Sequence, residues 1–363
     1  MKTLLFLTLA LALTADAQNP PRPAPIVSPE IADARVTLRM RAPQAKEVTL
    51  RGQWAKEPIP MTRGDDGVWT AIVEPAPAGV WEYGFVVDGL KVLDPRNPAI
   101  KPQREPQVSI LHVPSNPPAP WDWQDVPHGT VHGHSYASKL LGKQREILVY
   151  TPPGYERDTV KSYPLLVLQH GYGDNYRTWV AHGKAHWILD SLIAQNKARP
   201  MIVVMLDGHP LGTGPLEGNA MDAFQRELFE DAIPLVESLY RVEKDRTQRA
   251  IAGLSMGGWH SLTISMGNLD RFAWVGAFSA APPTAEATQK FLADPDAANA
   301  KLRLLWIAVG KDDFLRQRNE EYIAALKDKG IHHQWQLTEG DHSWPVWRRY
   351  LAEFAPLLFT EAK

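Results

Sequence analysis

Between residues 34 and 112, apolar and polar side chains alternate with a period of two, in short segments divided by turn residues. Such alternation is typical of strands that bury one face and expose the other. The segments that show it most clearly are residues 35–40, 47–51, 68–73 and 80–87. The dipeptide Asp88-Gly89 then marks a hairpin turn. Strands of this length and spacing predict a small all-β, immunoglobulin-like sandwich over residues 31–113.

From residue 145 onward the pattern changes to apolar runs that alternate with amphipathic stretches of helical length. The apolar runs cover residues 147–150, 165–168, 201–206, 250–254 and 304–309. The amphipathic stretches cover residues 224–240, 319–329 and 346–359. Continuously apolar strands between helices are typical of a mostly parallel sheet with helices on both faces. We therefore predict an α/β domain over residues 128–363.

Three segments fall outside these two domains. Residues 1–17 combine a lysine, an apolar run and the site Ala15-Asp16-Ala17, which together predict a signal peptide cleaved after Ala17. Residues 18–30 and 114–127 are rich in proline, and we interpret them as a flexible leader and an interdomain linker. The expected location is therefore secreted or periplasmic.

Composition and charge narrow the possible chemistry. The 363-residue chain has no cysteine, which excludes disulfides, thiolate metal sites and cysteine nucleophiles. Its formal net charge of −2 gives no electrostatic reason to expect nucleic acid or an anionic membrane as a partner. No apolar run has the length of a membrane-spanning helix, and no pattern in the sequence indicates an oligomeric state.

The segment Gly253-Leu254-Ser255-Met256-Gly257 follows an apolar strand and precedes residues 259–266, which can begin a helix. This is the G-x-S-x-G pattern of the nucleophile elbow of the α/β-hydrolase fold, in which a strained strand-to-helix turn exposes the serine. The motif is short, and its strand–turn–helix context is what makes it informative. We predict Ser255 as the nucleophile and the backbone N–H of Met256 as one oxyanion donor.

A second apolar strand, upstream of Ser255, ends in His170-Gly171-Tyr172-Gly173. The α/β-hydrolase fold places the other half of its oxyanion hole in such a loop. We therefore predict the Tyr172 N–H as the second oxyanion donor and Gly171 as part of the substrate-binding loop. The alternative is an ordinary glycine-rich turn, which the presence of the elbow downstream disfavours.

The acid and the base of this fold follow the serine in the order Asp or Glu, then His. Asp312 and Asp313 both follow a buried strand, and their spacing does not decide between them. His332 and His333 lie between a helix and a predicted strand, where we expect a structural role. His342 lies in a short loop before the C-terminal helix. We predict His342 as the general base, with the acid stabilising its imidazolium.

Two other histidine-containing segments compete for a functional role. His128, His132 and His134 have a spacing compatible with metal ligation, but no neighbouring carboxylate completes a ligand set. We interpret them as a structural group and predict neither a metal nor a cofactor. His209 follows the carboxyl end of another strand, on the same edge as Ser255, and is expected to shape the substrate pocket.

From about residue 125 to 359 the chain resembles carbohydrate esterase family 1, which includes feruloyl and acetylxylan esterases. The matching stretches are residues 126–131 (VPHGTV), 149–155 (VYTPPGY), 227–237 (ELFEDAIPLVE), 252–258 (AGLSMGG), 310–314 (GKDDF) and 342–348 (HSWPVWR). Several motifs in the right order are more specific than the elbow alone. The resemblance implies that the acid is the second aspartate of GKDDF, which is Asp313.

The N-terminal segment resembles the early-set sandwich of glycogen-branching type, with carbohydrate-binding character, that precedes such esterases. The matching stretches are residues 36–43, 48–54, 67–69 and 83–89. Trp54 and Trp81 would stack on sugar rings if they were exposed. Tryptophans of a sandwich more often belong to its core, so sugar binding does not follow from the resemblance.

The resemblance implies a secreted serine ester hydrolase that acts on feruloylated or acetylated xylan of the plant cell wall. A feruloyl group needs apolar walls, for which Tyr172, Trp344 and Trp347 are candidates, and we favour it over an acetyl group. Alternatives are an acetylxylan esterase and a siderophore esterase of the enterochelin type. A non-catalytic carbohydrate-binding protein on this scaffold would have lost a member of the triad, and here every member is present.

Overall fold

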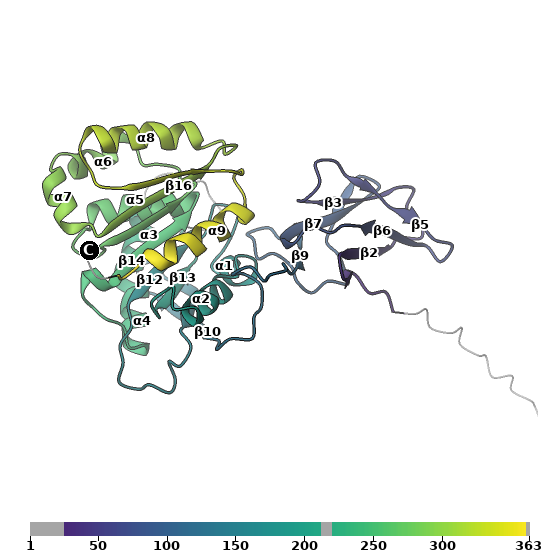
Figure 1. Ribbon diagram of the computed structural model, residues 1–363, viewed down its shortest axis with the longest axis horizontal. Helices are drawn as coiled ribbons and strands as arrows, with labels where there is room; N and C mark the ends of the chain where they lie inside the picture. The colour runs from purple at the N-terminus through teal and green to yellow at the C-terminus, as the bar shows by residue number, and fades with distance from the viewer. Residues whose placement is uncertain (1–24, 212–219, 361–363) are drawn as a thin grey trace, which may run out of the picture.

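The computed structural model describes residues 25–211 and 220–360. The chain forms a β-sandwich and a larger α/β domain, which lie side by side in Figure 1. The expected signal peptide, residues 1–17, lies outside the described residues. None of the helices in the described ranges combines the length and the apolar character needed to cross a lipid bilayer.

The sandwich consists of two antiparallel sheets, ordered β1-β2-β6-β5 and β4-β3-β7-β8, with β9 paired to β7. Its strands are β1 (Glu30–Ala32), β2 (Arg35–Arg41), β3 (Val48–Gly52), β4 (Ile59–Pro60), β5 (Thr62–Arg63), β6 (Val68–Val73), β7 (Gly79–Val87), β8 (Leu90–Val92) and β9 (Ser109–Val113). Asp88 and Gly89, both with positive φ, join β7 to β8, as a two-residue hairpin turn requires. The core between the sheets includes Val36, Leu38 and Leu50, so the alternating pattern correctly predicted these strands.

The α/β domain contains one eight-stranded sheet in the order β10-β11-β13-β12-β14-β15-β16-β17. The strands are β10 (Thr130–Ser138), β11 (Lys143–Thr151), β12 (Leu165–Gln169), β13 (Ile202–Leu206), β14 (Arg249–Leu254), β15 (Trp274–Phe278), β16 (Leu304–Gly310) and β17 (Gln334–Thr338). Strand β11 pairs antiparallel with both β10 and β13, and the remaining pairs are parallel. The loops after β12 to β17 therefore meet at one edge of the sheet, where this fold binds ligands.

Helices cover both faces of this sheet. They are α1 (Thr178–Ala181), α2 (Ala185–Ala194), α3 (Ala220–Glu227), α4 (Ile233–Leu239), α5 (Met256–Gly267), α6 (Ala285–Leu292), α7 (Pro295–Lys301), α8 (Arg316–Asp328) and α9 (Trp344–Phe354). Short 3-10 turns cover Arg246–Gln248 and Ala355–Leu357. Within β12, Leu165 and Val167 belong to one apolar core and Leu166 and Leu168 to the other. Burial on both faces explains why the strand is continuously apolar.

The expected helix over residues 224–240 is interrupted. A π-helical turn at Leu228–Ala232 separates α3 from α4. Pro234 lies in the first turn of α4, and because it has no N–H it cannot donate to the preceding turn, which leaves the helix free to widen there. The amphipathic pattern could not show this break, because the buried face continues through it.

The proline-rich segment between the domains is packed rather than extended. Asp122 accepts hydrogen bonds from the backbone N–H groups of Ser115 and Ala119, and it pairs with His112 of β9. Trp121 packs against the core that lies under α2 and α9. Helix α9 also contacts strand β7 of the sandwich. The domains therefore contact each other directly, in addition to being joined by this segment.

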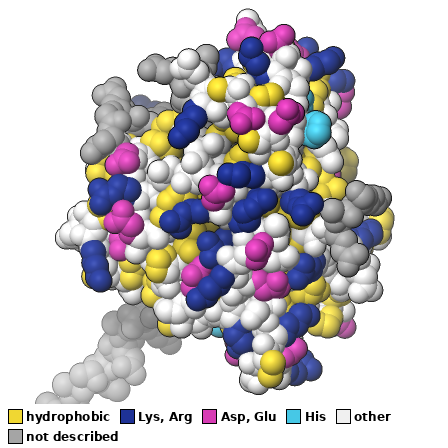
Figure 2. Space-filling view, turned by 90° about the vertical axis from the view of Figure 1, so that its left-hand side faces the viewer, with side chains coloured by type: hydrophobic (Ala, Val, Ile, Leu, Met, Phe, Trp, Pro, Cys, Tyr) yellow, Lys and Arg dark blue, Asp and Glu magenta, His cyan; other side chains and the backbone are white. Residues whose placement is uncertain are grey.

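The face of the α/β domain that is turned away from the sandwich carries interspersed acidic and basic side chains (Figure 2). No large patch of one charge is visible on this face. This distribution agrees with the small net charge of the chain.

Candidate active site

Ser255 lies at the turn between β14 and α5 with φ 52° and ψ −112°. A positive φ is rare for a residue with a side chain and marks local backbone strain. Glycines make the turn possible: a Cβ on Gly257 would lie 2.6 Å from the His170 carbonyl oxygen, and one on Gly253 would lie 2.6 Å from the Gly257 carbonyl oxygen. The Ser255 N–H donates to the Phe278 carbonyl over 2.8 Å and anchors the turn.

The predicted acid, base and nucleophile lie in one hydrogen-bonded chain. The Ser255 Oγ is 3.0 Å from His342 Nε2. On the other side of the ring, His342 Nδ1 is 2.9 Å from Asp313 Oδ2 and 3.0 Å from Oδ1. The Asp313 side chain is buried and also accepts a hydrogen bond from the Leu315 N–H. Asp312 is exposed, so the structure places Asp313 and not Asp312 against the histidine.

The two predicted oxyanion donors belong to segments that lie next to Ser255. Met256 is the first residue of α5, where backbone N–H groups have no intrahelical acceptor. Tyr172 lies within a turn that the Asp174 N–H closes by donating to the Gly171 carbonyl over 3.1 Å. A Cβ on Gly171 would lie 2.6 Å from Leu254 Cδ1 and 3.6 Å from Ser255 Cβ. The loop of residues 171–174, called the oxyanion loop below, therefore runs directly beside the nucleophile.

Two histidines hold the oxyanion loop from within the domain. His170 Nδ1 donates to the Gly171 carbonyl, and its Nε2 accepts from the Gly208 N–H, each over 2.8 Å. His209 Nε2 donates to the Tyr172 carbonyl over 2.8 Å. Burial is the main cause that lowers the pKa of His209 to about 4, so its ring is neutral at neutral pH. His209, predicted to shape the substrate pocket, holds the residue that carries a predicted oxyanion donor.

The buried Arg145 orders the loop that carries His209. Its guanidinium donates to both carboxylate oxygens of Glu227, at 2.6 and 3.0 Å, and to the carbonyls of Asp207 and His209. Charge-assisted hydrogen bonds in a buried site are strong and directional. His170 and Glu227 lie in motifs that the sequence shows, and Arg145 lies in none. The sequence predicts no role for any of the three, because Arg145 and Glu227 pair across 82 residues and His170 accepts from Gly208, 38 residues away.

The expectation that Trp344 forms an accessible wall of the substrate site is wrong. Its side chain is 1% exposed and packs edge-on against Trp179, with ring centroids 4.9 Å apart. Trp344 is the first residue of α9, and its indole belongs to the apolar core that α9 shares with the sheet and α2. Trp347 is also buried, and its ring packs against that of His342. The exposed aromatic residues beside the site are Tyr172 and Phe314, at 47% and 74% exposure.

Three further histidines contact residues outside the candidate site. His128 pairs with Asp190, and His134 bonds to the Tyr240 hydroxyl. His333 Nδ1 donates to the Ile331 carbonyl. Within residues 25–211 and 220–360, no cluster of three or more His, Asp or Glu side chains is arranged to hold a metal ion.

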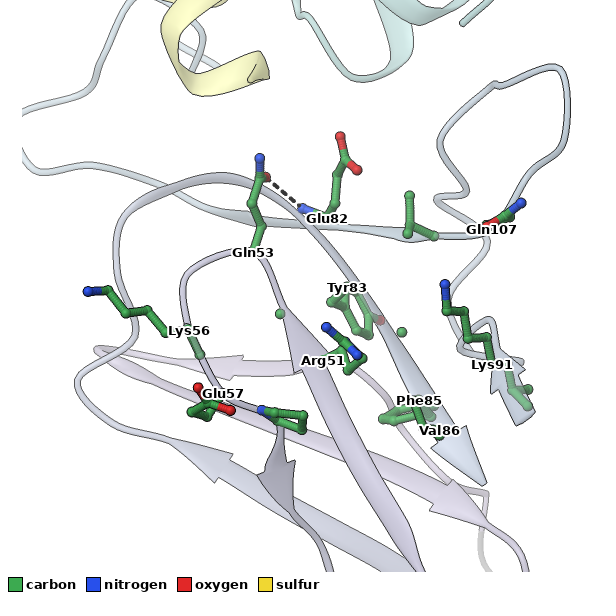
Figure 3. Close-up of a pocket in the computed structure, with 16 residues that line it drawn as sticks. Arg51, Gln53, Lys56, Glu57, Glu82, Tyr83, Phe85, Val86, Lys91 and Gln107 are labelled. Carbon is green, nitrogen blue, oxygen red and sulfur yellow. Dashed lines mark hydrogen bonds between the residues drawn. The ribbon is translucent and has the colours of Figure 1, made fainter. Parts of the chain in front are cut away.

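The sandwich has a groove of about 320 Å³ between β3, β7 and residues 107–108 (Figure 3). The aromatic side chains in its lining, Tyr83 and Phe85, are buried and present no open ring face. Trp54 and Trp81 pack partly against the sandwich core. In the described part of the chain, the groove therefore has no exposed aromatic platform of the kind that stacks on sugars.

Sequence comparisons agree with this architecture. Residues 138–358 match the Esterase family, and residues 27–100 match carbohydrate-binding module 48, the isoamylase N-terminal domain. The chain belongs to the Esterase family. Both resemblances that the motifs predicted are thereby confirmed, as is the expected α/β-hydrolase fold preceded by a sandwich.

Three proteins are similar to this member of the Esterase family over 64% or more of its chain. An endo-1,4-β-xylanase/feruloyl esterase from Xylanibacter ruminicola is 30% identical over 332 residues, which are 89% of this chain. The chain spans only 44% of that relative's length. A solved ferulic acid esterase is 28% identical with a TM-score of 0.57, covering 64% of this chain and 99% of its own. The enterobactin esterase of Shigella flexneri, at 20% identity and a TM-score of 0.62, shares the fold over 89% of this chain and 92% of its own.

Proposed function

We propose that this member of the Esterase family is a serine carboxylic-ester hydrolase with Ser255 as nucleophile, His342 as base and Asp313 as acid. The proposal rests on the hydrogen-bonded chain from the Ser255 Oγ through the His342 ring to Asp313, with distances of 3.0 and 2.9 Å. The strained backbone of Ser255 supports it, because strain of this kind gathers at functional sites.

The proposed reaction is a two-step acyl transfer. His342 accepts the Ser255 proton as Oγ attacks the ester carbonyl, and the N–H groups of Met256 and Tyr172 donate to the oxyanion. His342 then protonates the leaving alcohol, and the acyl group remains on Ser255. Water, deprotonated by His342, attacks the acyl-enzyme and releases the carboxylic acid and the free serine. Asp313 holds the ring in the required tautomer throughout.

For the substrate we propose feruloyl esters of plant cell-wall hemicellulose, cleaved outside the cytoplasm. The names of two similar proteins, a xylanase/feruloyl esterase and a ferulic acid esterase, support this choice. The exposed rings of Tyr172 and Phe314 support it as well, because an aromatic acyl group can pack against them. The centroid of the Phe314 ring lies 4.4 Å from that of His342.

The test compares the wild-type protein with Ser255→Ala on methyl ferulate, p-nitrophenyl acetate and acetylated xylan. We expect turnover of methyl ferulate by the wild type and a loss of about 10⁴-fold or more in the variant. Ser265→Ala is the matched control, since Ser265 is a buried serine of α5, the helix that follows Ser255, and its Oγ donates to the Leu262 carbonyl. It should retain wild-type turnover.

The three substrates also separate the alternatives. Turnover of acetylated xylan without methyl ferulate would make the protein an acetylxylan esterase and overturn the feruloyl assignment. A wild-type protein that is inactive on all three substrates but binds xylan would favour a non-catalytic binding protein. Full activity of the folded Ser255→Ala variant would overturn the nucleophile itself.

A further inference from the structure

The junction between the two domains contains a cluster of ionisable side chains, all buried except Glu82, which is partly buried. Glu82 and Lys101 come from the sandwich side, and Asp174, His182 and Arg348 come from the hydrolase side. Lys101 is only 6% exposed, although lysine is almost never buried without a partner. Its Nζ lies 2.8 Å from Glu82 Oε1 and 3.3 Å from Asp174 Oδ1. One ammonium group therefore joins a carboxylate of each domain.

Two other members of the cluster, His182 and Arg348, support this link through Glu82 and strand β7. Burial alone would raise the pKa of Glu82, but His182 and Lys101 outweigh it and lower the pKa to about 2. The carboxylate is therefore ionised at neutral pH. In Figure 3 the Glu82 side chain points away from the sandwich strands, toward the hydrolase ribbons at the top of the view. Arg348 of α9 donates to the carbonyls of Val80 and His182, which ties strand β7 to the hydrolase.

Asp174 is the last residue of the oxyanion loop. Its N–H closes the turn that contains Tyr172 by donating to the Gly171 carbonyl. Burial raises the pKa of Asp174, and the charge of Lys101 acts against that rise. The position of the Asp174 side chain is therefore coupled to Lys101 by charge, and to the Tyr172 backbone by the turn.

The residues that follow Lys101 also contact the oxyanion loop through their backbone. The Arg104 N–H donates to the Gly173 carbonyl over 3.1 Å, and Gln103 forms an antiparallel bridge with Asp174. The Arg104 guanidinium lies 4.9 Å from the centroid of the Tyr172 ring. A segment that leads into the sandwich strand β9 thus covers one side of the oxyanion loop, while His209 holds the Tyr172 carbonyl.

We propose that Lys101 is a positioning residue of the esterase, through which the sandwich domain holds the oxyanion loop in its catalytic geometry. This inference rests on the proposed function, because it takes the Tyr172 N–H as an oxyanion donor. Such donors act through preorganisation, and a displacement of about 1 Å can cost about 100-fold in rate. The sandwich then contributes to turnover of small soluble esters, on which polysaccharide binding has no influence.

The test measures kcat and KM of Lys101→Met on p-nitrophenyl acetate and methyl ferulate. Methionine keeps the length of the apolar stem and removes the charge. We expect kcat to fall by about 10-fold or more and KM to stay within about 2-fold. The oxyanion donors stabilise the transition state more than the bound substrate, so their displacement affects kcat more than KM. Lys101→Arg restores a cation and should recover most of kcat.

His112→Ala is the control for a weakened junction. His112 pairs with Asp122 and contacts Trp187 of the hydrolase, and neither partner belongs to the oxyanion loop. This variant should keep the wild-type kcat. If His112→Ala and Lys101→Met lower kcat equally, or if folded Lys101→Met keeps the wild-type kcat, the proposal is overturned.

A double variant tests the route through Asp174. Asp174→Asn preserves the shape of the side chain, and we expect it to lower kcat in the same way. Lys101→Met combined with Asp174→Asn should be no slower than the slower single variant, since coupled residues are not additive. Additive losses contradict the proposal. If Lys101→Met does not fold, a folded Asp174→Asn protein with wild-type kcat overturns it instead. The proposed function is tested independently, by the activity of the wild type itself. A wild-type protein without esterase activity would refute the proposed function, whereas the role of Lys101 is tested by the kcat of each variant relative to an active wild type.

Discussion

His209 Nε2 donates a 2.8 Å hydrogen bond to the carbonyl oxygen of Tyr172, the residue whose N–H we assign to the oxyanion. His209 is itself held in place, because its backbone carbonyl accepts a hydrogen bond from the buried Arg145. A histidine that sequence reasoning assigned to the pocket wall thus acts on the backbone that the reaction needs.

Replacing His209 by leucine should lower kcat on methyl ferulate by about 10- to 100-fold. Without the hydrogen bond to its carbonyl, the Tyr172 backbone can move, and the Tyr172 N–H loses its position toward the oxyanion. His209→Gln can still donate and should lose less. His333→Leu is the control, since the His333 ring bonds to the local Ile331 carbonyl, away from the oxyanion loop. Equal activity of His209→Leu and the wild type in a steady-state assay would contradict this role.

Asp313→Asn should lower kcat by about 10⁴-fold with little change in the fold. The amide is isosteric, but it can donate to Nδ1 and so stabilise the tautomer that cannot accept the serine proton. Asp312→Asn changes an exposed neighbour in the same turn and should leave kcat unchanged. Single-turnover measurements of acylation with p-nitrophenyl acetate provide the comparison, and similar losses in the two variants would count against the assignment.

Gly257→Ala should destabilise the protein by about 1–3 kcal/mol and reduce turnover, because the new methyl would lie 2.6 Å from the His170 carbonyl oxygen. Gly267→Ala, at the other end of α5, is the matched control: nothing lies within 4 Å of its added Cβ. That variant should unfold at the wild-type urea concentration or slightly above it. Equal urea midpoints for the two variants would exclude a close backbone crossing at Gly257.

The buried His260 should make the folded protein less stable at acidic pH. Burial is the main cause that lowers its pKa from 6.5 to about 3, so the unfolded chain binds a proton that the folded chain does not. The contribution of the neutral ring to stability is fully present above pH 6.5 and is lost as pH falls toward 3. His260→Leu should therefore show a stability slope shallower by about 1 kcal/mol per pH unit between pH 6 and 4. Urea curves at pH 6, 5 and 4 measure it, and identical slopes would refute it.

The sequence by itself determined the two-domain architecture and the chemistry of the elbow. Alternation in residues 35–87 follows from strands with one buried face, and the apolar run of β14 follows from burial on both faces. Gly253 and Gly257 flank Ser255 because the turn leaves no room for a side chain. These are local requirements of the backbone, so they can be recognised from residues that are neighbours in the sequence.

Only the tertiary structure decided which distant side chains support the site. Trp344 shares a motif with the site residues, yet the orientation of α9 buries it. His209 reaches Tyr172 because β12 and β13 are adjacent parallel strands whose loops meet at one edge. Lys101 reaches Asp174 because the sandwich packs against that edge. Such contacts depend on packing between segments far apart in the chain, and no local period of apolar and polar residues encodes them.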